Sequence, residues 1–454
     1  MLTDEDRRRE LALLSQALET LSKGFETLPD FNRDTEWSET TAAVIAAAER
    51  MQDNFPYAHP FYAGQMLKPP HPVARVAYQM AMWINPNNHA LDGGRASSAL
   101  EKEAVAQLAD MYALSPFLGH LTSSGTLANL EALWIAGQEH PGKAIVASTD
   151  SHYTHNRLCK VLGLGFDAIE TEHDGRMSLS ALESRLSDGD VGTIVATLGT
   201  TGFGAVDPLP EILELARRFG ARVHIDGAYG GYFRLCDGLP SDATAAYAAM
   251  PEADSIAVDP HKHGLQPYGC GCILFADPAV GKHYKHDSPY TYFSSDELHL
   301  GEISLECSRA GAAAVALWAT QQAQPLIKGG EFATNLNRCH LAAKSLAAHV
   351  KADTNASLIT EPMLDIVVWA LAPTETMSAS QLAQSTFDIA ATLDLHLAVI
   401  DVPAERLPES YRAANEPTVA CLRSCLMKPE HEAAMPEIIG LLNKATAIAR
   451  QGGH

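Results

Sequence analysis

The chain has 454 residues, of which 46% are hydrophobic and 19% are charged, as is ordinary for a soluble protein of two or three packed subdomains. Its formal net charge of −22 argues against nucleic acid or an anionic membrane as a default partner. We expect neither a signal peptide nor a membrane-spanning stretch, which would need roughly 20 apolar residues. The eight cysteines lack framework or finger-like spacing, so we expect a reduced, cytoplasmic protein without a metal site.

The N-terminal residues 1–73 predict a helical arm. Helical periodicity with charged faces covers 4–24 and 38–52, and a short loop containing a proline separates the two. The proline-rich stretch 56–72 then predicts extended or looped backbone. Two such helices suit an arm that faces a second subunit, so we expect a homodimer.

Residues 74–325 predict a large α/β domain. Helices are expected at 74–84 and at 98–112, the second opened by a serine cap. From Ser124 onward, helical and strand patterns alternate, which predicts three layers around a mostly parallel sheet. The later helices are expected at 126–136, 153–162, 178–186, 209–219 and 301–323, and the strands at 143–148, 192–197, 221–225, 255–258 and 271–275.

Residues 326–454 predict a small α+β domain. Strand-like runs at 364–370, 395–401 and 419–427 mix with helical segments, the last at 433–450. The functional site is expected in the large domain, because open α/β sheets bind ligands at the carboxyl ends of their strands.

Two strand ends of the large domain carry an aspartate and a lysine. Asp226 ends a short apolar run, and Lys262 follows another, 36 residues later (262 − 226). This layout can hold pyridoxal 5′-phosphate (PLP): the amine bonds to the cofactor aldehyde, and the carboxylate keeps the pyridine nitrogen protonated. A lone lysine after a strand is usually a solvated surface group, but the pair predicts a PLP site. Burial is expected to lower the pKa of Lys262 toward the neutral amine.

The segment 254–264, Asp-Ser-Ile-Ala-Val-Asp-Pro-His-Lys-His-Gly, with Pro267-Tyr-Gly-Cys-Gly271 behind it, resembles the lysine motif of the group II PLP-dependent amino-acid decarboxylases. This family includes aromatic amino-acid, tyrosine, glutamate and histidine decarboxylases, and the resemblance extends from about His59 to the C-terminus. It implies the aspartate aminotransferase-like fold type I of PLP-dependent transferases. It also implies conversion of an L-α-amino acid to the primary amine and CO2.

Several cofactor contacts follow from the resemblance. The turn Ser124-Gly125-Thr126 opens a helix, which is an anion site in its own right, and in the family this turn holds the cofactor phosphate. Simple helix capping is the alternative interpretation. The resemblance further implies that His152 stacks on the pyridine ring, that Thr200 approaches the cofactor and that His261 contacts the phosphate. His155 could share a helix face with His152, as metal ligands would, but no third ligand is evident.

Other residues are implied to act on the substrate. One of Tyr290 and Tyr292 is expected to return a proton to the substrate carbon after CO2 leaves. Ser308 and Arg309 are expected to serve the partner's site across a dimer interface, and a structural role for Arg309 is the alternative. Arg423, on a strand, matches an arginine that binds the substrate α-carboxylate. The polar loop residues Gln65 and Asn88 are further substrate-side candidates.

The sequence leaves alternatives open for both the substrate and the reaction. Family frequency favours tyrosine or another aromatic amino acid, and glutamate or aspartate comes second. Transamination, carbon–carbon cleavage or aldehyde formation on the same scaffold is the first rival reaction. A non-catalytic protein that retains the fold is the second rival, although Asp226, Lys262 and the phosphate turn argue against it.

Overall fold

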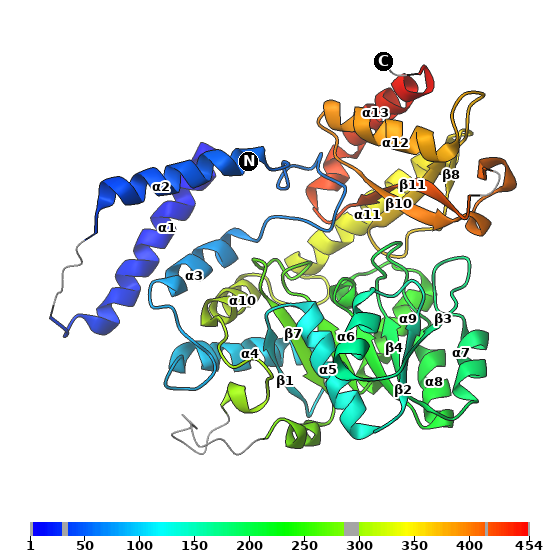
Figure 1. The fold of residues 1–454 in the computed structure, drawn as a ribbon. Helices are drawn as coiled ribbons and strands as arrows, with labels where there is room; N and C mark the ends of the chain where they lie inside the picture. The colour runs from blue at the N-terminus through cyan, green and yellow to red at the C-terminus, as the bar shows by residue number, and fades with distance from the viewer. Residues whose placement is uncertain (1–2, 30–34, 286–298, 414–415, 453–454) are drawn as a thin grey trace.

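The structure is a computed structural model, and it describes residues 3–29, 35–285, 299–413 and 416–452. Two helix-covered sheets form the body, and helices α1 (Asp4–Ser22) and α2 (Trp37–Arg50) lie to one side of it (Figure 1). No helix among the described residues is long and apolar enough to cross a membrane.

The larger sheet has seven strands in the order β1-β7-β6-β5-β4-β2-β3. Neighbours from β6 through β5, β4 and β2 to β3 are parallel, and only β7 runs antiparallel to its neighbours. The mostly parallel sheet of the prediction is therefore confirmed. The strands are β1 (Leu118–Thr122), β2 (Ala144–Ser148), β3 (Phe166–Ile169), β4 (Val191–Thr197), β5 (Arg222–Asp226), β6 (Ser255–Val258) and β7 (Gly271–Phe275).

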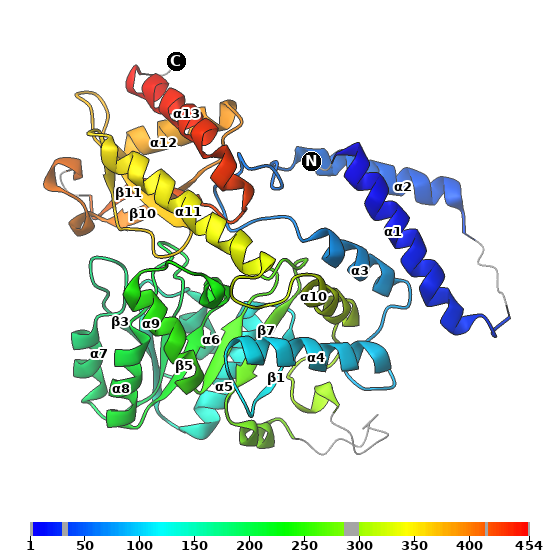
Figure 2. The ribbon, with the colours of Figure 1, turned by 180° about the vertical axis from the view of Figure 1, so that it is seen from behind.

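Helices cover both faces of this sheet, which gives three layers (Figures 1 and 2). The strands β2, β4, β6 and β7 are buried along their whole length, as expected for a sheet sandwiched between helices. The helices are α3 (Pro72–Met82), α4 (Arg95–Met111), α5 (Gly125–Glu139), α6 (Thr154–Leu162), α7 (Leu179–Leu186), α8 (Leu209–Phe219), α9 (Ser241–Ala249) and α10 (Gly311–Ala323).

Two predicted helix starts in this domain are wrong. Helix α4 begins at Arg95 after Gly94, so Ser98 lies inside its first turn instead of capping it. The helix predicted at 301–323 begins only at Gly311, as α10. Before that point, the hydroxyl of Ser304 accepts from the backbone N–H of Glu306 (3.1 Å), a local bond that competes with helix formation.

The smaller sheet is antiparallel, with the order β10-β11-β9-β8, and it has a hydrophobic core of its own. Its elements match the predicted α+β pattern at the C-terminus. They are α11 (Glu331–Ala352), β8 (Ala356–Leu358), β9 (Ile366–Leu371), α12 (Ala379–Thr392), β10 (Ala398–Pro403), β11 (Thr418–Cys425) and α13 (Glu430–Arg450).

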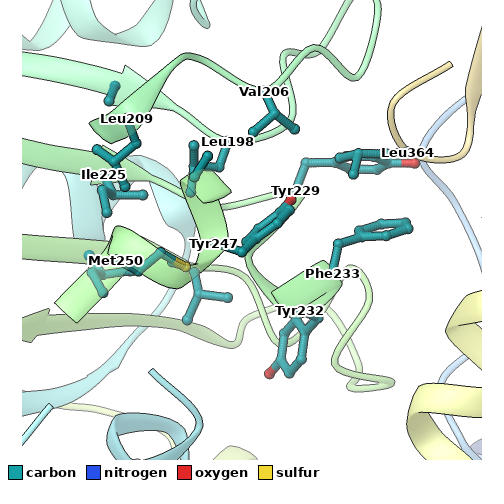
Figure 3. Close-up of a cluster of buried hydrophobic side chains, with 14 of the residues drawn as sticks. Leu198, Val206, Leu209, Ile225, Tyr229, Tyr232, Phe233, Tyr247, Met250 and Leu364 are labelled. Atoms are coloured by element: carbon teal, nitrogen blue, oxygen red, sulfur yellow. The ribbon is translucent and has the colours of Figure 1, made fainter. Parts of the chain in front are cut away.

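One hydrophobic cluster joins the two sheets near the end of β5 (Figure 3). Ile225 of β5, Leu198 after β4 and Leu364 before β9 belong to it, and all three are fully buried. Tyr229 of the same cluster donates its hydroxyl to Asp365 Oδ1 (2.6 Å). The chain that follows β5 is thereby anchored to both sheets, which fixes the position of Asp226.

Candidate active site

A cavity of about 190 Å³ lies where β2, β4, β5 and β6 end. These strands are parallel, so their carboxyl ends meet at one edge of the sheet, the usual place for a ligand. Seven residues proposed from the sequence line it, namely Ser124, Gly125, Thr126, His152, Asp226, His261 and Lys262. Eight further residues also line it, namely Asn129, Thr154, Thr197, Gly199, Thr201, Ala228, Tyr229 and Asp259.

The N-terminus of α5 forms one wall of the cavity. Ser124 is its N-cap, and its hydroxyl accepts from the N–H of Leu127 (3.3 Å). The N–H groups of Gly125 and Thr126, in the first turn, have no partner inside the helix and can bind an anion. A Cβ on Gly125 would lie 2.5 Å from Asp259 Oδ1, so only glycine allows that carboxylate to approach.

Asp226 is buried at the end of β5 and is held by two donors. Its Oδ2 accepts from His155 Nε2 (2.9 Å), and its Oδ1 accepts from the N–H of Ala228 (3.1 Å). Burial alone would raise the pKa of Asp226, but the hydrogen bond from His155 and the charge of Lys262 outweigh it and hold that pKa well below its usual range. Asp226 is therefore anionic at any working pH.

His155 is the residue whose importance the sequence left open. Its ring is fully buried, and its Nδ1 has no hydrogen-bond partner in the described part of the chain. The contact with Asp226 spans 71 residues of sequence, so local spacing could not reveal it. The described residues contain no cluster of three metal-ligating side chains. The hydrogen bond itself makes His155 a partner of Asp226.

Lys262 follows β6 and pairs with a second buried carboxylate. Its Nζ lies 3.1 Å from Asp259 Oδ2. Burial alone would lower the pKa of Lys262, but Asp259 and Asp226 outweigh burial and raise that pKa above its usual value. The expectation of a lowered pKa is therefore wrong for the protein alone, because it left Asp259 out of account.

Two histidines of the cavity have a lowered pKa. His152 Nδ1 accepts from the N–H of Thr154 (3.2 Å), and its ring stacks on Tyr153. His261 Nδ1 lies 2.7 Å from the carbonyl oxygen of Cys270, which can only accept, so this nitrogen carries the proton. Burial lowers the pKa of both His152 and His261.

Six other residues proposed from the sequence do not line this cavity, namely Thr200, Asn88, Ser308, Arg309, Gln65 and Arg423. Thr200 is buried and its hydroxyl accepts from the N–H of Ala205 (3.0 Å), while its neighbour Thr201 lines the cavity. Asn88 is buried and donates to Glu101 Oε2 (2.6 Å). Ser308 is exposed and accepts from Asn87 Nδ2 (3.3 Å).

Arg309, expected at a dimer interface, is internally bound in the described chain. Its Nη1 lies 2.7 Å from both Glu101 Oε1 and the carbonyl oxygen of Leu121. Tyr290 and Tyr292 lie outside the described residues.

Arg423 and Gln65 meet behind the loop that carries Thr201. Arg423 donates to the carbonyl oxygens of Thr201 (2.5 Å) and Gly202 (3.1 Å), and its Nη1 lies 3.5 Å from Gln65 Oε1. Among the described residues, no carboxylate pairs with Arg423. Its positive charge is thus available near the cavity.

The donor set fits PLP. Lys262 offers an amine for the aldehyde, Asp226 an anionic oxygen for the ring nitrogen, and the N-terminus of α5 a phosphate site. Thr197 Oγ1 and Asp259 Oδ1 are buried and have no hydrogen-bond partner in the described chain, as expected of atoms that await a ligand.

Comparison with known proteins agrees with this chemistry. The family model of the pyridoxal-dependent decarboxylase conserved domain matches residues 76–372. A probable L-aspartate decarboxylase of Halobacterium salinarum is 33% identical over 258 residues, which cover 56% of this chain and 70% of that protein. An L-tyrosine decarboxylase of Enterococcus faecium is 27% identical over 365 residues, covering 58% of this chain and 60% of that protein.

The fold agrees as well. The structure of Oryza sativa TDC with PLP and tryptamine superposes with a TM-score of 0.76 at 18% identity and covers 98% of each chain. The expected fold type I is therefore confirmed. Because the family model spans well over half of the sequence, the chain belongs to the pyridoxal-dependent decarboxylases and is a PLP-dependent amino-acid decarboxylase.

Proposed function

We propose that the residues around this cavity remove the α-carboxylate of an L-amino acid and leave the primary amine. Lys262 would bond to the cofactor aldehyde, Asp226 would hold the pyridine nitrogen, and Ser124, Gly125 and Thr126 would bind the phosphate. The cofactor, when bound, withdraws the electron pair that the departing CO2 leaves behind. The observation that carries this proposal is that all five residues line one cavity at the strand ends.

Asp226 has the task of keeping a proton on the cofactor ring. It can do so only as an anion, and the hydrogen bond from His155 keeps it anionic although it is buried. We therefore assign His155 as the residue that positions Asp226 and maintains its charge.

His152 and His261 take different places. We propose that His152 stacks on the ring face, because its Nδ1 is held by the N–H of Thr154 and its ring orientation is fixed. His261 is tied to Cys270 through Nδ1 and lies beside the phosphate wall. In the glycine-rich loop we propose Thr201, in place of Thr200, as the cofactor contact.

Arg423 is proposed to position the α-carboxylate, with Gln65 supporting it. Its two backbone contacts fix the guanidinium behind Thr201, and no described carboxylate neutralises it. Loss of CO2 requires the carboxylate to lie out of the conjugated plane, so its orientation contributes to the rate.

The proton that replaces CO2 is still assigned to Tyr290 or Tyr292.

For the side chain of the substrate, we propose an acidic amino acid, aspartate first. The sequence alone favoured an aromatic substrate, but the relative of higher identity is a probable aspartate decarboxylase. Tyrosine is the second candidate, supported by the relative from Enterococcus faecium.

A substrate screen tests both the reaction and the choice of substrate. The purified holoenzyme is incubated with L-aspartate, L-glutamate and L-tyrosine, and CO2, amine, aldehyde and keto acid are measured. We expect equal amounts of CO2 and amine, with the highest kcat/KM for aspartate. A higher kcat/KM for tyrosine would overturn the substrate proposal. Keto acid without CO2 would identify a transaminase, and CO2 with aldehyde an aldehyde-forming enzyme.

We further propose that the chain has three domains, 1–73, 74–325 and 326–454, and works in a reducing, cytoplasmic setting. We also propose that it forms a homodimer. Neither α1 nor α2 buries a single residue, and Leu11, Trp37 and Ile45 on them are exposed. A second subunit would cover such apolar side chains. Light scattering during gel filtration should give twice the chain mass of 48.8 kDa. The mass of a single chain would contradict the proposal.

A further inference from the structure

A second and larger cavity, of about 390 Å³, shares no lining residue with the cavity that contains Lys262. Its walls come from six separate segments, of which Ala58 and Gln324 contribute one residue each and the other four contribute more. These four are the proline-rich segment 68–72, the chain just after Lys262, the start of α11 and residues 428–430 at the start of α13. No step assigned to the cofactor site uses this cavity.

Two lysine side chains in its wall lack an acidic partner. Lys428 is buried and donates to the carbonyl oxygen of Tyr62 (2.7 Å), and Lys68 Nζ lies 3.4 Å from the carbonyl oxygen of Met427. Neither ammonium group pairs with a carboxylate anywhere in the described chain. Each has three N–H donors, so at least one donor per lysine is left for another acceptor.

The acidic groups nearby are mostly committed to other partners. Asp365 accepts from Tyr229 and lies 3.2 Å from His263 Nε2, Glu10 pairs with Arg75, and Glu432 pairs with Arg338. Among the described residues, Glu430 is the one carboxylate that lines the cavity itself. Positive charge therefore exceeds negative charge at this wall, in a chain whose overall net charge is −22.

Helix termini add to this positive field. The first turns of α3, α11 and α13 all contribute to the wall, through Pro72, Phe332 and Glu430. Figures 1 and 2 show the starts of these three helices converging on the same region. The N-cap residues of α11 and α13, Gly330 and Pro429, have no side-chain capping bond. Three positive helix ends and two unpaired lysines together favour an anion.

The remainder of the wall is apolar. Leu265, Phe332 and Leu336 line it together with prolines of the segment 68–72. A ligand that fills the cavity must therefore combine an anionic head with a short apolar body, because a bare inorganic anion would leave the apolar part of the wall without contacts.

We propose that this cavity is a second ligand site, which binds a small organic anion, either a carboxylate or a phosphate monoester with an apolar body, through Lys68 and Lys428. Burial, and then the charge of Lys68, lower the pKa of Lys428 to about 8. Lys428 is thus still mostly protonated at neutral pH, and anion affinity falls as the pH rises through that value.

Calorimetric titration of the holoenzyme with hexanoate, hexyl phosphate, inorganic phosphate and hexanol tests the site. We expect saturable binding of hexanoate or hexyl phosphate, and whichever binds more tightly identifies the head group. Inorganic phosphate should bind more weakly and hexanol should give no saturable heat. Absence of saturable binding for both organic anions, or equal binding of hexanol, would overturn the proposal.

Lysine variants locate the bound anion. Lys428→Met and Lys68→Met should each weaken binding by roughly tenfold or more, as expected for loss of a charged hydrogen bond. Lys444→Met is the matched control, since Lys444 lies on α13 but is exposed. This variant should bind the organic anion with the affinity of the parent. Thermal unfolding and the visible cofactor absorption check that each variant is folded. If Lys428→Met does not fold, Lys68→Met carries the test; parental affinity in the folded lysine variants would place the anion elsewhere.

Discussion

The two cavities of this protein differ in whether their buried charged side chains are paired with each other. In the cofactor cavity every strong charge has an internal partner: Asp226 is paired with His155, and Lys262 with Asp259. In the second cavity Lys68 and Lys428 have no carboxylate partner in the described chain: both contact backbone carbonyls, and Lys428 Nζ also lies 5.4 Å from the centre of the Tyr62 ring. A buried charge without a partner costs free energy, so paired charges fix protonation states before a ligand arrives, whereas unpaired charges need a ligand to compensate them.

The largest expected effect separates the two cavities directly. Lys262→Met should abolish turnover and the visible absorption of the bound cofactor, because no other amine in that cavity can bond to the aldehyde. Lys428→Met removes the same charge from the other cavity and should leave turnover at the parental level. Steady-state rates and absorption spectra of the two purified variants check this contrast. Turnover by Lys262→Met would refute the assignment of the lysine.

A second effect concerns the proton that replaces CO2. General acid catalysis contributes about 10²–10⁴-fold, so Tyr290→Phe or Tyr292→Phe should lower the rate of amine formation by that order. The loss should come with more aldehyde, because the unprotonated product has time to react with oxygen. Amine and aldehyde are quantified for each variant separately. If both variants produce only amine at the parental rate, the proton comes from another group, and His152 is the next one to test.

A third effect measures what the pairing in the cofactor cavity contributes to stability. Removal of one member of a buried charge pair typically destabilises a protein by about 3–5 kcal/mol, so Asp226→Ala should lower the free energy of unfolding by that order. It should also weaken cofactor retention and slow the reaction. Denaturant unfolding of the apoprotein, followed by a cofactor-release assay, gives both quantities. Unchanged retention and rate would make Asp226 a purely structural residue.

The smallest effect is a shift in pH dependence. Without the hydrogen bond from His155, burial dominates and the pKa of Asp226 rises. The parent should keep its activity down to acid pH, because the pKa of Asp226 is far below the working range. His155→Leu should lose kcat/KM as the pH falls, starting at a higher pH than the parent, and His155→Gln, which keeps a donor, should restore part of the parental profile. Identical profiles for His155→Leu and the parent would remove His155 from the account.

Sequence patterns predicted much of the fold, and the misses have physical reasons. Strands β6 and β7 and helix α8 have the predicted bounds, since each is an apolar or amphipathic run between clear turn residues. Strands β1 and β3 were not predicted. β1 contains Gly119 and His120, and β3 is a four-residue edge strand with Asp167 exposed, so neither shows a continuous buried pattern.

In the candidate site, too, some features could be predicted from the sequence and others could not. That Asp226, Lys262 and the turn at Ser124 lie around one cavity could be predicted, because each stands at or just after the end of a strand or at the start of a helix. The pairing of Asp226 with His155 could not be predicted, because it depends on packing between distant segments. The choice of Thr201 over Thr200 was equally out of reach, since a loop has no period that assigns neighbouring side chains to a cavity.

The central claim is that Lys262 carries the cofactor. Borohydride reduction of the holoenzyme, followed by proteolysis and peptide mass spectrometry, tests it most directly. The predicted result is one modified peptide, with the pyridoxyl group on Lys262, and no modification of Lys68 or Lys428. A pyridoxyl group on any other lysine, with Lys262 unmodified, would contradict the account.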